Sequence, residues 1–112
     1  SEIRQFRSVY SSADGEVTFE GQCRKKDGFV IVEGRIVGRC EVVCDVTGVV
    51  FFDTLDEEIK LKLVSEAYKG FDVEFDIIEC DDEVFDCDIF LQEEIDSFRL
   101  GYHRQVSNDE DR

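Results

Sequence analysis

The sequence predicts an α+β fold: a mainly antiparallel, strongly curved and partly barrel-like β-sheet covered by one carboxyl-terminal amphipathic helix. Three observations lead to this prediction. Apolar and polar residues alternate along several segments, as they do in half-buried strands. Near the carboxyl end, the apolar spacing changes to that of a helix. The chain is also 42% hydrophobic with 10 Phe, which is too apolar for a disordered acidic tail.

The first strands precede a basic turn. Residues 1–12 predict a ragged strand around Phe6 and Val9. Residues 16–24 alternate cleanly and predict a half-buried strand, which ends in a turn over residues 24–28. The residues expected on its buried face are Val17, Phe19, Gly21 and Cys23.

A long strand follows over residues 29–44, with the even-numbered residues from Val30 to Cys44 on one face. At ~3.3 Å per residue it would reach about 53 Å, which is longer than a small domain. We therefore expect Gly34 or Gly38 to bend or bulge the strand, so that the sheet curves strongly.

Further strands complete the sheet. Residues 45–48 predict a hairpin turn, because Asp and Gly tolerate the backbone angles of tight turns. Strands are then expected at 49–52, near 57–65 and at 71–77, which makes five or six antiparallel strands in all.

The helix is predicted from Leu91, Ile95, Phe98 and Tyr102, which recur at helical spacing. Asp88 is expected to cap its first amides, and Gly101 to supply a left-handed stop. We expect residues 1–104 to form a single compact acidic domain, because 112 residues bury one core but not two. Residues 105–112 are expected to be a disordered polar tail.

The charge balance points to the class of partner. The chain has 28 Asp and Glu against 13 Lys and Arg, a net charge of −15. A protein that grips nucleic acid by its phosphates needs a basic surplus, so we expect a basic protein partner. No apolar run reaches the ~20 residues that cross a bilayer, and no signal peptide is recognisable. We therefore expect a soluble cytoplasmic protein without a membrane partner.

Catalytic patterns are lacking, and we expect neither an enzyme nor a cofactor. The only histidine, His103, follows the predicted helix and has no nucleophile near it in the sequence. No glycine-rich phosphate loop is present. The cysteines are scattered at apolar positions, and we expect reduced, buried thiols. Cys40 and Cys44 on one strand would lie about 13 Å apart, too far for a shared zinc ion unless the chain turns there.

The segment from Glu79 to Asp88 carries six carboxylates and no basic residue. It has no Gly and follows a strand, so it does not resemble an EF-hand loop. Two interpretations stay open: a solvated turn in which Asp88 caps the helix, or an acidic docking patch for a partner rich in Lys and Arg. The candidate partner-binding residues are Glu79, Asp81, Asp82, Glu83 and Asp86.

Three segments together resemble the YceD family, whose members are named large ribosomal RNA subunit accumulation protein. They are the long strand ending in Cys44-Asp45-Val46-Thr47-Gly48, the strand at 57–65, and the closing residues 89–95 followed by Tyr102-His103. The resemblance covers about residues 34–104 and is closest to divergent bacterial members. The family-motif positions are Cys44, Asp45, Gly48, Tyr102 and His103.

One departure from the family pattern lies at the hairpin. Many family members carry a Cys-x-x-Cys there, and in this chain Thr47 stands where the second cysteine would be. A single cysteine cannot hold zinc alone. We therefore expect no metal or redox role at this turn.

The resemblance implies a non-catalytic factor that supports the synthesis, processing or accumulation of large-subunit ribosomal RNA. An acidic surface would bind a basic protein, such as a ribosomal protein, and RNA would be contacted through that protein, which we favour, or directly by Arg24, Lys25 and Lys26. Those three residues could also form a solvated turn.

The alternative function is an acidic inhibitor that mimics nucleic acid and binds a basic nuclease or DNA-binding protein. A mimic needs regularly spaced rows of carboxylates, whereas an assembly factor needs one patch. The oligomeric state stays open, since apolar edge strands allow homodimerisation.

Overall fold

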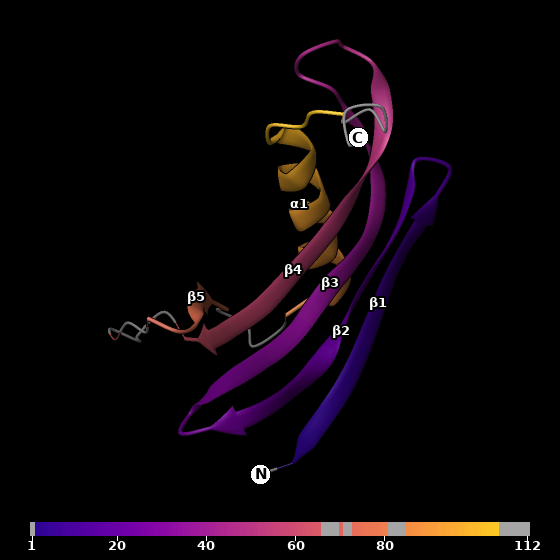
Figure 1. Cartoon of the computed structure of the whole chain (residues 1–112). Helices are drawn as coiled ribbons and strands as arrows, with labels where there is room; N and C mark the ends of the chain where they lie inside the picture. The colour runs from indigo at the N-terminus through magenta and orange to yellow at the C-terminus, as the bar shows by residue number, and fades with distance from the viewer. Residues whose placement is uncertain (1, 66–69, 71–72, 81–84, 106–112) are drawn as a thin grey trace, which may run out of the picture.

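The computed structural model describes residues 2–65, 70, 73–80 and 85–105. These residues form an α+β fold: a five-stranded sheet, ordered β1-β2-β3-β4-β5, whose long strands bend around a helix, α1 (Figure 1). The elements are β1 (Ile3–Ser12), β2 (Gly15–Lys26), β3 (Phe29–Val43), β4 (Val50–Val64), β5 (Asp76–Glu79) and α1 (Cys87–Leu100). The extents of 53 × 27 × 25 Å describe an elongated molecule.

The core lies between the inner face of the sheet and α1. Alternate residues of β2, β3 and β4 point inward, as their period-two pattern predicted. From the helix, Leu91 and Ile95 complete the cluster. The buried members from the sheet are Val17, Phe19, Val32, Ile36, Cys40, Val42, Leu55, Ile59 and Leu61.

Glycines allow the tight curvature of the sheet. Gly21 of β2 pairs with Gly34 of β3, and a Cβ atom added at Gly21 would lie 2.1 Å from the Glu33 carbonyl oxygen. Only a residue without a Cβ permits this approach. The register between β2 and β3 runs unbroken along both strands, so β3 bends and does not bulge.

The two predicted hairpin turns are present. Between β2 and β3, Asp27 and Gly28 have φ values of 53° and 87°, as a two-residue primed turn requires. Between β3 and β4, Gly48 has φ 78° and its amide donates a 2.8 Å hydrogen bond to the Cys44 carbonyl. These turns fix the order of the three longest strands.

Some sequence-based expectations about the sheet are not confirmed, and others were wrong. The described strands form an open sheet with edges at β1 and β5, so closure into a partly barrel-like form is not confirmed. β4 is one strand where two were expected. β5 pairs with β4 in parallel and covers only residues 76–79, while Val73, within the strand expected at 71–77, is 92% exposed. A parallel neighbour is not encoded in the alternation of one strand.

The ends of α1 also differ from the prediction. Asp86, not Asp88, is the N-cap, and its carboxylate accepts hydrogen bonds from the amides of residues 88 and 89. Asp88 instead accepts a hydrogen bond from the Ser8 hydroxyl of β1. Gly101 has an ordinary φ of −73°, and Tyr102 lies beyond the helix and is exposed. The helix therefore ends without a left-handed stop.

Candidate functional site

His103, which is only 5% exposed, connects the segment after α1 to the β3–β4 hairpin by hydrogen bonds. Its backbone amide donates to Asp45 Oδ2 at 2.8 Å, and its carbonyl accepts from the Asp45 amide at 2.8 Å. In the side chain, Nδ1 lies 2.9 Å from Asp53 Oδ2 and Nε2 lies 2.5 Å from the Phe98 carbonyl oxygen. We call this group of Asp45, Asp53, Phe98 and His103 the His103 junction.

The surroundings of the His103 ring favour its charged form. A carboxylate and a carbonyl are both acceptors, so both hydrogen bonds form only when both ring nitrogens carry hydrogen. Burial opposes the charge, but the hydrogen bonds with Asp53 and with the Phe98 carbonyl outweigh it and raise the pKa of His103 above its usual value. Because both ring nitrogens are engaged in hydrogen bonds, the imidazole is suited to a structural role.

Cys44 sits at the start of the same hairpin turn and is 1% exposed. A hydrogen bond from the Thr47 hydroxyl, together with bonds from the backbone amides of Gln105 and Thr47, lowers the pKa of Cys44 to about 7. The structure therefore brings together four of the family-motif positions: Cys44, Asp45, Gly48 and His103. The fifth, Tyr102, is 72% exposed and takes no part in the junction.

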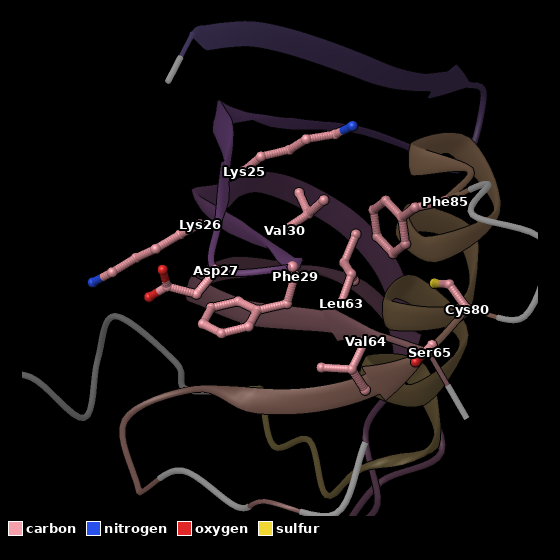
Figure 2. Close-up of a pocket in the computed structure, with 11 residues that line it drawn as sticks. Lys25, Lys26, Asp27, Phe29, Val30, Leu63, Val64, Ser65, Cys80 and Phe85 are labelled. Carbon is pink, nitrogen blue, oxygen red and sulfur yellow. The ribbon is translucent and has the colours of Figure 1, made fainter. Parts of the chain in front are cut away.

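The three basic candidates gather at the opposite end of the long strands. Arg24, Lys25 and Lys26 end β2 directly before the two-residue turn, and we call them the basic tip. Lys25 and Lys26 are exposed, whereas Arg24 is half-buried. Among the described residues, none of the three forms an ion pair, in contrast to Arg7 with Glu20 and Arg35 with Asp56. The tip therefore carries three cations without ion pairs among the described residues, although the Asp27 carboxylate lies beside Lys26 (Figure 2).

A cavity adjoins the basic tip on the inner side of the sheet, where α1 no longer covers it. Its volume is about 740 Å³, and Figure 2 shows Lys25 and Lys26 on one side of it with Cys80 and Phe85 on the other. Val30 and Leu63 add apolar surface to its wall. A second cavity of about 500 Å³ shares Lys25 and Val30 with the first and is lined further by Glu2, Arg4, Cys23 and Arg24. Together they form what we call the tip groove.

The acidic candidates are only partly described. Glu79 is exposed at the end of β5, and Asp86 is occupied as the helix cap. Asp81, Asp82 and Glu83 lie outside the described residues. Of the predicted docking patch, the structure therefore describes only two residues: Glu79, which is exposed to solvent, and Asp86, which caps the helix.

Sequence reasoning missed a carboxyl pair between β4 and α1. A hydrogen bond with Glu57, burial, and repulsion from Glu57, Asp76 and Glu93 raise the pKa of Glu94 to about 7. Glu57 Oε1 is buried without a hydrogen-bond partner. The signal was present, because Asp53 and Glu57 fall at inward positions of β4, where a carboxylate needs a partner.

The described part of the chain shows no metal-binding cluster, no disulfide and no helix that could span a membrane. It contains no group of three or more His, Cys, Asp or Glu side chains placed to hold a metal ion. The described cysteines are all free thiols: Cys40 and Cys44 are buried, and Cys23, Cys80 and Cys87 are half-buried. The one described helix has neither the length nor the apolar character to cross a membrane.

Comparison with known proteins finds no matching family model, no matching curated protein and no matching solved structure.

Proposed function

We propose that this protein is a non-catalytic factor that supports the synthesis, processing or accumulation of large-subunit ribosomal RNA, and that the basic tip and the tip groove contact that RNA. The setting comes from the resemblance to the YceD family. The observation that carries the contact is the basic tip: three cations without ion pairs among the described residues, beside a cavity of about 740 Å³, in a chain of net charge −15.

The composition of the groove suits single-stranded RNA. Phosphates would contact Lys25 and Lys26, while unstacked bases would pack on Phe85 and the neighbouring apolar wall. Because the whole molecule is strongly acidic, RNA would be repelled from most of its surface and would approach by this end. Direct contact at the tip replaces the contact through a basic protein as the favoured route.

A charge reversal at the tip tests the proposal. We expect Lys25→Glu/Lys26→Glu to abolish recovery of precursor ribosomal RNA after ultraviolet crosslinking in cells, because both residues would then repel phosphate. Arg104→Glu/Arg39→Glu changes the net charge equally at exposed positions outside the tip groove and is the matched control. Equal loss in both variants would reject the tip. Absence of ribosomal RNA from the wild-type sample would reject the function.

A basic protein partner is the second candidate, and the crowded carboxylates near α1 favour it. Asp76 of β5 and Glu93 of α1 both repel Glu94, which contacts Glu57, and the exposed Glu79 ends β5. Lysine or arginine side chains of a ribosomal protein would relieve this repulsion. Replacing Asp76 and Glu79 with Lys should then weaken capture of that protein while crosslinking to RNA persists.

The inhibitor alternative has less support. On the outer face of the sheet, Glu20 lies 3.4 Å from Arg7, and Asp56 lies 2.5 Å from Arg35. Such pairing interrupts the continuous row of free carboxylates that mimicry of a nucleic acid needs. Capture of a single basic nuclease or DNA-binding protein in place of ribosomal components would restore this alternative.

A further inference from the structure

β1 is an unusually open sheet edge. It pairs with β2 over all ten of its residues, and among the described residues no strand pairs with its other side. Natural edge strands are protected by charged side chains, especially Lys, by Pro, by a bulge, by short length, or by a helix or loop that covers the edge. β1 has 10 residues, an unbroken register and no Lys or Pro, whereas the other edge, β5, has 4 residues.

The charge along β1 is close to balanced. The strand contains no carboxylate of its own, although the chain has 28. Its two arginines face carboxylates just outside the strand: Arg7 lies 3.4 Å from Glu20, and Arg4 lies 4.0 Å from Glu2. Because its charge is offset, this edge selects neither an acidic nor a basic partner. That leaves backbone pairing and side-chain fit to determine its occupant.

We propose that β1 pairs antiparallel with β1 of a second copy of this chain, around a twofold axis at Ser8, so that two sheets join into one. This proposal goes beyond the proposed function and does not depend on it. Side chains directly opposite must lie on the same face of the joined sheet. The Ser8 register places Phe6 opposite Tyr10 of the second copy on the helix side, and Arg7 opposite Val9 on the outer side.

Neighbouring registers fit less well. A twofold axis at Arg7 would set the two Arg7 side chains directly opposite each other, and like charges in that position destabilise a sheet. Axes at Phe6 or Val9 would keep charges apart but would leave more of each strand unpaired. The Ser8 axis pairs residues 4–12 of both copies and puts no two like charges opposite each other. It therefore retains the longest ladder without repulsion.

Salt dependence separates this contact from RNA binding. Each copy carries a net charge of −15, so two copies repel each other until salt screens them. We expect the dimer to strengthen from low salt to about 0.5 M NaCl. Binding of RNA through Lys25 and Lys26 should weaken over the same range, because salt competes for the phosphates.

Sedimentation equilibrium of the purified protein at several concentrations and both salt levels tests the dimer. In the Ser8 register, Val9→Lys places a cation opposite Arg7 twice per dimer and should raise the dissociation constant by about three- to tenfold. Val9→Glu should lower it by a similar factor. Net charge alone predicts the reverse, since Val9→Lys reduces the total repulsion.

Val37→Lys is the matched control, because Val37 is 45% exposed on the outer face of an internal strand and Val9 is 47% exposed. We expect Val37→Lys to dimerise like the wild type, and circular dichroism to show all three variants folded. A monomer at every concentration and salt level would overturn the proposal, as would equal effects of Val9→Lys and Val37→Lys. A monomer that binds a strand of another protein in a Val9-dependent manner would also overturn it.

Discussion

Protonation of His103 is coupled to the stability of the folded state. Its two ring nitrogens face a carboxylate and a carbonyl, so losing the proton breaks one of two buried hydrogen bonds. The pKa of His103 is raised on folding, which means that its stabilisation is complete below the unfolded value near 6.5 and is lost as pH rises through the folded value.

Asp53→Asn tests this coupling. An amide cannot replace the charge that holds the imidazolium, so we expect a loss of about 1–2 kcal/mol at pH 6 and a smaller loss at pH 8.5. Urea unfolding at the two pH values measures both quantities. An equal loss at both would show that Asp53 does not stabilise the charged form of His103. Asp56→Asn, at an exposed position of the same strand, serves as the control.

The raised pKa of Glu94 leads to a second prediction about a single residue. The pKa of Glu94 is raised from 4.5 to about 7 on folding, so ionisation costs stability progressively as pH rises from below 4.5 to above 7. We expect Glu94→Gln to stabilise the protein by about 1 kcal/mol at pH 8 and to have little effect at pH 5. Chemical unfolding of this variant beside Glu41→Gln checks it. A destabilised Glu94→Gln at pH 8 would mean that the Glu57–Glu94 contact is attractive.

At the scale of elements, the close approach of β2 and β3 predicts a sensitive glycine. A methyl group at Gly21 would meet the Glu33 carbonyl oxygen at 2.1 Å, and the backbone must shift to admit it. We expect Gly21→Ala to cost about 2 kcal/mol or more, against less than about 1 kcal/mol for exposed Arg35→Ala. Thermal unfolding compares them. Equal melting temperatures for Gly21→Ala and Arg35→Ala would show that the sheet relaxes freely where β2 and β3 approach each other.

The elements set by local pattern were predictable, and those set by distant contacts were not. Residues close together in the sequence determine several features: the alternation of β2 and β3, the turns at Gly28 and Gly48, and the helix face of Leu91 and Ile95. The continuity of β4 was hidden, because Asp53 and Glu57 interrupt its apolar face and find partners on segments far along the chain. The parallel pairing of β5 depends equally on a distant strand.

The candidate site was predictable only in part. Arg24, Lys25 and Lys26 were identified from the sequence, but the adjoining cavity needs Phe85 and Leu63 from other elements. Cys44, Asp45 and His103 were identified through the resemblance, whereas Asp53 became visible only when β4 placed it beside the imidazole. Charge and turn chemistry are local properties, while burial and enclosure belong to the assembled fold.

For the whole molecule, His103, Glu94 and the overall charge act in the same direction. His103 and Glu94 both favour the folded state at lower pH, and protonation also reduces the repulsion among 28 carboxylates. We expect the melting temperature to be higher at pH 6 than at pH 8, and to rise with salt at pH 8 more than at pH 6. Scanning calorimetry over this range measures both. A higher melting temperature at pH 8 than at pH 6 would contradict it.

The order of the elements has a consequence for biosynthesis. β1 to β4 follow one another in the sheet as they do in the chain, so they can pair as they leave the ribosome, and α1 emerges only after them. Until it arrives, Phe19, Ile36 and Ile59 lie on an uncovered apolar face. The nascent chain is therefore exposed to aggregation until Leu91 and Ile95 pack over that face.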